Sequence, residues 1–108
     1  MPQIDLKYSC DLNLDILKIF QEIELLINKL DSSSGECKCR AYPADDYLHS
    51  HIYTYVKVLN KPHRDEEFMK NLLRELSQLL KPFFPQGCFY SIELDFSGDY
   101  YLTSRIAT

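Results

Sequence analysis

The stretch MPQIDLKYS, residues 1–9, alternates apolar and polar side chains from its start. Ile4, Leu6 and Tyr8 share one side of an extended chain, and the polar residues between them share the other side. Alternation of this kind is typical of a half-buried β-strand. We therefore predict a strand over residues 2–9, and its first residue is a proline.

Beyond this strand the pattern predicts a helix and then a second strand. Apolar residues recur at three- and four-residue steps over residues 14–30, with Asn13 as the expected N-cap and the breaker DSSSG (residues 31–35) behind them. The stretch ECKCRAY (residues 36–42) alternates again and is predicted to be a strand that ends near Pro43.

The same order of elements follows a second time. HIYTYVKVL (residues 51–59) is dense in β-branched and aromatic residues, which favours a strand. Asp65 is the expected N-cap of a helix that runs to about Lys81. CFYSIELDF (residues 88–96) alternates and predicts the last strand, after which the chain continues as an arm or a short added strand.

Two β-α-β units in succession predict the fold class. We expect an α+β fold with one four-stranded mixed sheet and both helices on one face. The chain of 108 residues is predicted to form a single domain over residues 1–108, with pseudo-repeats at about 2–43 and 51–97.

Two helices on one face leave the other face of the sheet bare. Tyr53, Tyr55, Cys37 and Cys39 indicate that this face is not simply wet. We therefore predict that it is buried against further copies of the chain, as a homo-oligomer.

Composition excludes several classes of partner. The chain carries 12 basic and 16 acidic residues, a net charge of −4 that repels nucleic acid and anionic lipid. No apolar run approaches the roughly 20 residues that span a bilayer, and the start of the chain lacks the basic-then-apolar order of a signal peptide. We expect a cytoplasmic protein with reduced cysteines, without nucleic-acid or membrane partners.

The predicted topology gathers charged residues around the start of the first strand. A right-handed crossover makes the two strands of each unit parallel, so Lys38 and Arg40 should lie close to Pro2. If a pseudo-two-fold relates the halves, the loop with His63 and Arg64 returns to the same edge of the sheet.

Pro2 brings its own chemistry to that edge. Methionine before a residue as small as proline is normally removed, which leaves a free secondary amine at Pro2. The pKa of a free α-amine is near 8, and both positive neighbours and partial burial lower it. Our hypothesis is that Pro2 is a neutral general base, and that the nearby cations hold an anionic substrate.

Several short motifs carry a resemblance to a known family. They are the proline after the initiator methionine, KCR (residues 38–40), HR (residues 63–64) before DEEF (residues 65–68), and YSIEL (residues 90–94). In this order and spacing they resemble the tautomerase superfamily, and most closely its longer-chain branch, 5-carboxymethyl-2-hydroxymuconate isomerase.

The resemblance implies a cofactor-independent homotrimeric isomerase. It implies that Pro2 shifts a proton in an unsaturated 2-oxo or 2-hydroxy di- or tricarboxylic acid of aromatic-compound degradation. Arg40 matches the family's strand-two arginine and is the second expected catalytic residue, while Arg64 matches the arginine before the second helix. Lys38 and Arg64 are the expected substrate-binding residues. The isomerase branch has arginine where this chain has Lys38 and an acidic residue where it has Lys7.

Two other interpretations remain. One is a non-catalytic trimer that keeps the fold as a binding or structural module. The other is a zinc site made by Cys37-x-Cys39 and His49-x-His51, which the spacing disfavours because structural zinc sites separate their cysteines by two to four residues. We therefore expect neither a metal nor a cofactor.

Overall fold

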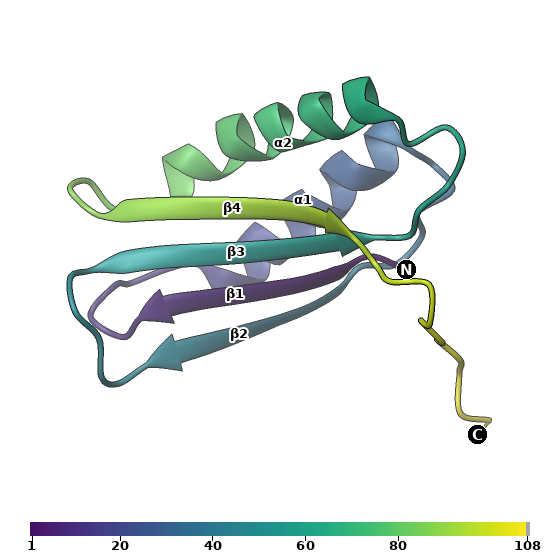
Figure 1. Cartoon of the computed structure of the whole chain (residues 1–108). Coiled ribbons are helices and arrows are strands. Elements are labelled where there is room, and N and C mark those ends of the chain that lie inside the picture. Colours follow the sequence, from purple (N-terminus) through teal and green to yellow (C-terminus); the bar gives the residue numbers. More distant parts are fainter. Residues whose placement is uncertain (108) are drawn as a thin grey trace.

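The computed structural model describes residues 1–107; Thr108, the last residue of the predicted domain, lies outside the described residues. Seven elements follow one another along the chain (Figure 1). They are β1 (Gln3–Ser9), α1 (Ile16–Leu30), β2 (Lys38–Ala44), β3 (His51–Val58), α2 (Glu66–Leu80), a 3₁₀ turn (Lys81–Phe83) and β4 (Phe89–Phe96).

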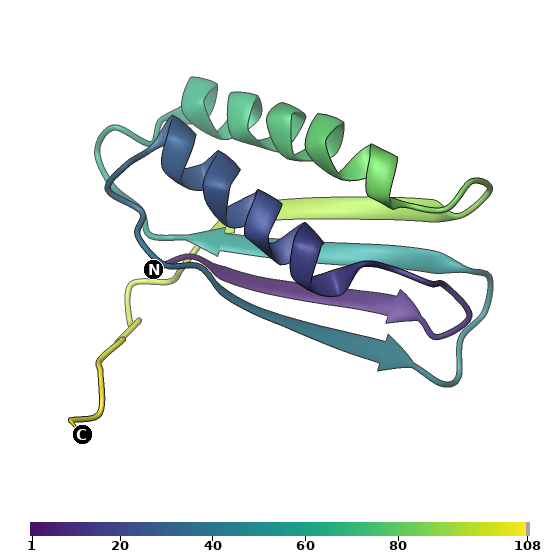
Figure 2. The ribbon, with the colours of Figure 1, turned by 180° about the vertical axis from the view of Figure 1, so that it is seen from behind.

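The four strands form one mixed sheet in the order β2-β1-β3-β4. β1 is parallel to β2, β3 is parallel to β4, and the two central strands β1 and β3 are antiparallel. Figure 2 shows both helices on the same face of this sheet. The predicted α+β architecture of two β-α-β units is thus confirmed.

Both helices bury a stripe of residues spaced by four. In α1 the stripe is Ile19, Ile23 and Ile27, and α2 presents the equivalent leucines 72, 76 and 80. Side chains four apart lie one above the other on a helix, so each stripe faces the sheet. Full burial of such a side chain contributes roughly 1.5–3 kcal/mol.

The inward residues of the two central strands complete the core. Ile4 and Leu6 of β1 and Ile52, Val56 and Val58 of β3 are at most 1% exposed. The alternation predicted from the sequence therefore decides which face of the sheet meets the helices.

The two helix starts differ in how well the sequence predicts them. Asp65 caps α2 as predicted, because its carboxylate accepts a 2.8 Å hydrogen bond from the backbone N–H of Phe68. The prediction for α1 is wrong: the helix begins at Ile16 after Asp15, two residues beyond the expected start, so Asn13 is not its cap. No side chain caps this end within the described residues.

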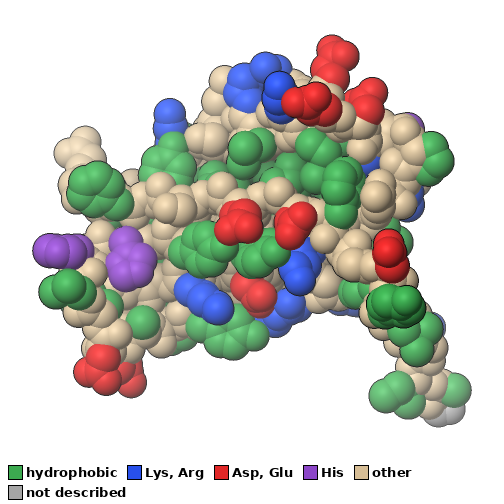
Figure 3. Space-filling view, in the orientation of Figure 1, with side chains coloured by type: hydrophobic (Ala, Val, Ile, Leu, Met, Phe, Trp, Pro, Cys, Tyr) green, Lys and Arg blue, Asp and Glu red, His purple; other side chains and the backbone are tan. Residues whose placement is uncertain are grey.

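The open face of the sheet is a mixture of apolar, acidic and basic side chains (Figure 3). Tyr53 donates its hydroxyl to Glu93 at 2.5 Å, and Tyr55 donates to Asp95 at 2.9 Å. The bond to Glu93 is the main reason that the pKa of Tyr53 rises to about 12. These tyrosines lie on the open face as expected.

Cys37 and Cys39 do not lie on the open face. Cys39 pairs with Ile4 in the register of β1 and β2, and both cysteines pack against the core. Burial raises the pKa of Cys37 to about 12 and that of Cys39 to about 11, so neither thiol is a nucleophile at neutral pH. Only the tyrosines thus support the predicted burial of the open face.

Residues 97–107 follow β4 as an arm without regular structure, which decides between the two predicted possibilities. The arm leaves the sheet beside the start of β1 (Figure 1). Within residues 1–107, neither helix is both long and apolar enough to cross a membrane.

Candidate functional site

The start of β1 and the start of β2 meet as the crossover predicts. Gln3 is the register partner of Lys38, and the backbone N–H of Lys38 donates a 2.9 Å hydrogen bond to the carbonyl oxygen of Pro2. Pro2 itself is buried, whereas Met1 in front of it is exposed. Its backbone is thus fixed by the sheet.

The loop after β3 returns to the same edge. Gln3 is opposite Lys57 in the antiparallel pair of β1 and β3, so the chain beyond Val58 runs past the first two residues. Burial first, and then the positive charges of Lys61 and Arg64, lower the pKa of the Met1 amine. The chain start therefore lies in a positive, partly desolvated environment.

Arg40 lies on the open face, beside the start of β1. Its Nη1 donates to the Gln3 side-chain oxygen at 2.6 Å, and its Nε lies 2.6 Å from Asp5 Oδ1. Asp5 Oδ1 is nevertheless buried without a hydrogen-bond donor among the described residues. The Nε–H of Arg40 therefore does not point at this oxygen. The ion pair is thus close but imperfectly directed, and the side chain of Arg40 is 41% exposed.

Lys38 also has an acidic neighbour. Its Nζ lies 2.7 Å from Glu36 Oε2, and this hydrogen bond raises the pKa of Lys38 and lowers that of Glu36. Both side chains are exposed to solvent, so the pair is weak and open to exchange with a ligand.

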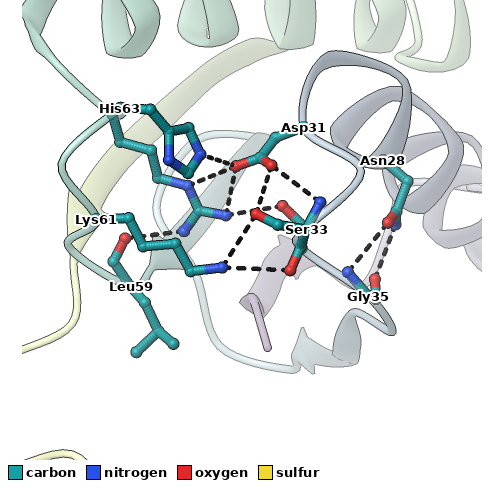
Figure 4. Close-up of polar contacts among 9 residues, drawn as sticks. Asn28, Asp31, Ser33, Gly35, Leu59, Lys61 and His63 are labelled. Carbon is teal, nitrogen blue, oxygen red and sulfur yellow. Dashed lines mark hydrogen bonds and ion pairs between the residues drawn. The ribbon is translucent and has the colours of Figure 1, made fainter.

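Arg64 is held inside its own chain (Figure 4). Its Nε and Nη2 lie 2.9 and 2.8 Å from Asp31 Oδ2. Nη2 also donates to Ser34 Oγ, and Nη1 donates to the carbonyl oxygen of Leu59, each at 2.8 Å. With the side chain only 2% exposed, the guanidinium joins the loop after α1 to the loop after β3.

Asp31 is the centre of this network. Burial by itself raises its pKa, but the hydrogen bonds from Ser33, His63 and Arg64 outweigh burial and hold the pKa well below its ordinary value. His63 Nε2 lies 2.7 Å from Asp31 Oδ2, and half of its side chain is exposed. The imidazole thus belongs to the same network as Arg64.

Two hollows flank the start of β1. One, of about 870 Å³, is lined by Met1, Glu36, Lys38 and residues 103–106 of the arm. The other, of about 620 Å³, lies on the open face beside Arg40. Both are wide enough for a small organic acid.

The second hollow contains Tyr101 of the arm. Its hydroxyl accepts a 3.0 Å hydrogen bond from Gln3 Nε2 and lies 3.5 Å from the carbonyl oxygen of Met1. The arm is thereby tied to the first residues of β1.

The structure therefore gathers Pro2, Lys38, Arg40 and Arg64 around one sheet edge, as predicted, but two of them face different ways. Arg40 faces the open sheet surface, and Arg64 is turned into the loop network. The acidic partners Glu36, Asp5 and Asp31 were missed. The signal for Asp5 was available, because a parallel register that pairs Gln3 with Lys38 also pairs Asp5 with Arg40.

The suggested zinc ligands do not converge. Cys37 directly precedes β2, whereas His51 begins β3 at the opposite end of the sheet, where its carbonyl oxygen accepts from Ser9 at the end of β1. Among residues 1–107 there is no group of three or more His, Cys, Asp or Glu side chains that can hold a metal ion.

Comparison with known proteins shows the fold at low sequence identity. No family model matches the chain, and no curated protein matches it. A 5-carboxymethyl-2-hydroxymuconate isomerase structure from Deinococcus radiodurans R1 aligns with TM-score 0.71 and 16% identity over 96% of this chain and 88% of that one.

Two further solved structures have the same fold. A 5-carboxymethyl-2-hydroxymuconate delta-isomerase aligns with TM-score 0.64 and 14% identity over 99% of this chain and 89% of that one. A fused 4-OT protein, described as a symmetric trimer, aligns with TM-score 0.69 and 10% identity over 95% of this chain and 93% of that one. The chain therefore has the fold of the tautomerase superfamily, as the resemblance predicts.

Proposed function

We propose that the chain is a cofactor-independent isomerase of the tautomerase type, which moves a proton in an unsaturated 2-oxo or 2-hydroxy acid. The observation that carries the proposal is the environment of the chain start. Burial and two cations lower the pKa of an amine there, and Pro2 lies one residue further along in a backbone fixed by β2. Isomerase structures with the same fold support it.

Removal of Met1 is the first requirement. In Met1-Pro2 the proline nitrogen is an amide and has no basic lone pair. Once Met1 is removed, the secondary amine of Pro2 takes over the terminal position beside Lys61 and Arg64. A lowered amine pKa leaves more of the neutral base at pH 7, which is the form that removes a proton from carbon.

The reaction then needs positive charge where the enolate oxygen develops. Arg40 is the residue that we propose for this role, because it is half exposed and its Nη2 group has no partner among the described residues. Fixed cations at a developing oxyanion lower the barrier by a large amount. Lys38 and Arg64 add to the attraction for the carboxylates of a di- or tricarboxylic substrate. Pro2, now protonated, returns the proton to another carbon.

We also propose that the protein is a homotrimer in the cytoplasm, acting in the breakdown of aromatic compounds. The fused 4-OT neighbour is a symmetric trimer. The open face of this chain carries half-buried Tyr53 and Tyr55, and residues 1–107 form no second layer over it. Native mass spectrometry should give three copies per assembly.

The function is tested with phenylpyruvate as the probe and the Pro2→Ala variant as the comparison. We expect measurable enol-keto conversion by the wild-type protein and a loss of about 10²-fold or more in kcat/KM for Pro2→Ala, since acid-base catalysis contributes about 10²–10⁴-fold. Pro85→Ala, in the loop before β4 at the opposite end of the sheet from Pro2, is the matched control. No conversion by the wild type, or an equal rate for Pro2→Ala, leaves the non-catalytic module as the better interpretation.

A further inference from the structure

We infer that Lys61, held in place by the Asp31–Arg64 pair, is the residue of the loop after β3 that binds the carboxylate of the substrate. This inference rests on the proposed function and replaces direct binding by Arg64 with a positioning role for it. Two observations carry it: Lys61 contacts Ser33, and it lies in the segment that follows Lys57, the register partner of Gln3.

Arg64 cannot bind a carboxylate through two N–H donors without breaking its own hydrogen bonds. Three of its nitrogens already donate to Asp31, Ser34 and Leu59, and its side chain is 2% exposed. Planar, two-point recognition of a carboxylate needs two neighbouring N–H donors that are free together. Within residues 1–107 Arg64 has no such pair.

Lys61 differs from Lys38, Arg40 and Arg64 in its partners. Lys38, Arg40 and Arg64 each lie within 2.8 Å of a carboxylate oxygen. Lys61 Nζ instead donates to the carbonyl oxygen and the hydroxyl of Ser33, at 3.2 and 3.1 Å, and has no acidic partner among the described residues. Its charge is therefore not neutralised, and one of its three N–H donors is spare.

The position of Lys61 follows from the register and from the network. Gln3 is opposite Lys57, so Leu59 runs beside the chain start, and Arg64 holds the carbonyl of Leu59. On the other side, Asp31 accepts from the backbone and hydroxyl of Ser33, at 3.0 and 2.6 Å. Lys61 thus extends between two segments that the Asp31–Arg64 pair joins (Figure 4).

An ammonium group held this way fits one substrate feature. It presents a compact positive charge with a single free donor, which suits one oxygen of a carboxylate next to the reacting carbon. Its positive charge also lowers the pKa of the amine at the chain start, after burial and ahead of Arg64. Lys61 would then both bind the substrate and lower the pKa of the amine. The experiment has to separate these two effects.

The experiment compares phenylpyruvate with its methyl ester, which lacks the negative charge. Both are assayed at a pH on the alkaline plateau, where the amine is already neutral. For Lys61→Ala we expect the KM of the acid to rise about tenfold or more, because a charge-assisted hydrogen bond to the carboxylate is lost. The ester should change less than twofold. Lys70→Ala, an exposed lysine on α2, is the control and should change neither.

The positioning role of Arg64 is tested by a double-mutant cycle. Arg64→Lys should raise the KM of the acid on its own but add little to Lys61→Ala, because both changes remove the same contact. A role in stability alone gives additive effects. If Arg64→Lys does not fold, Ser33→Ala takes its place in the cycle.

The outcomes separate this inference from the proposed function. Equal effects on acid and ester, or no effect of Lys61→Ala on either, overturn the inference while the proposed function stands. If the wild type converts neither compound, the proposed function fails. Titration of phenylacetate, followed by backbone amide NMR, then decides: tenfold weaker binding by Lys61→Ala supports a carboxylate site at Lys61, and unchanged binding overturns it.

Discussion

Arg40 and Arg64 lie around the same sheet edge, and the structure uses them in opposite ways. Arg40 is on the open face, 41% exposed, in a close but poorly directed pair with Asp5. Arg64 is 2% exposed and fully engaged with Asp31 and two loops. Proximity to the chain start is therefore not enough to assign a ligand role, because the donors of an arginine must also be free.

The largest effect should come from breaking the buried pair. Asp31→Ala leaves the Arg64 guanidinium buried without its counter-charge, which costs about 3–5 kcal/mol. We expect the free energy of unfolding to fall by that amount in urea titrations. Asp5→Ala, which removes the partner of the half-exposed Arg40, should cost less than about 1 kcal/mol. Equal losses for the two variants would contradict the comparison.

The next effect concerns activity. Arg40→Gln should lower kcat for phenylpyruvate about 10²–10³-fold, the usual result of removing one group that stabilises an oxyanion. The melting temperature should hardly change, because Arg40 is bound loosely. Arg74→Gln, an exposed arginine on α2, is the control for loss of one positive charge. A large drop in stability with unchanged kcat would place Arg40 in the same class as Arg64.

A smaller effect on the free energy of unfolding is expected at acid pH. The folded-state pKa of Asp31 lies below its ordinary value of 3.8, so the stabilisation is present above that pH and is lost as the pH falls towards the folded-state pKa. The free energy of unfolding should therefore drop more steeply below about pH 4 for the wild type than for Asp31→Asn. Asp46→Asn, an exposed carboxyl, should keep the wild-type slope.

The smallest effect should come from the open face. Tyr53→Phe removes the hydroxyl that donates to Glu93 at 2.5 Å. In the separate chain this contact is exposed to solvent, so we expect a loss below about 1 kcal/mol in urea titrations at a concentration at which the copies are apart. A loss as large as that of Asp31→Ala would show that the open face stores as much stability as the buried network.

Much of the fold follows from local patterns in the sequence. Alternation in residues 2–9 and four-residue spacing in α2 report directly which side chains are buried, and Asp65 caps its helix as predicted. The start of α1 was predicted two residues too early because Asn13 is an equally good cap by type. Cys37 was predicted on the wrong face of the sheet, because alternation in a short strand does not say which of its two faces is buried.

The candidate site is predicted less completely, for a physical reason. Topology places Lys38 and Arg40 near Pro2, because crossovers are right-handed. Sequence pattern does not say which cation meets which acid, since Asp31 and Arg64 are 33 residues apart and meet only when two loops pack. The pattern does not indicate Lys61 either, because its contact with Ser33 also forms only when the two loops pack.

Catalysis by a free Pro2 amine requires that proline, and not Met1, is the first residue of the active chain. Two chains of otherwise identical sequence, one beginning at Met1 and one at Pro2, can be released from a cleavable fusion, checked by mass spectrometry and assayed with phenylpyruvate. The chain that begins at Pro2 should be at least about 10²-fold more active in kcat/KM. Equal activity of the two chains would contradict it.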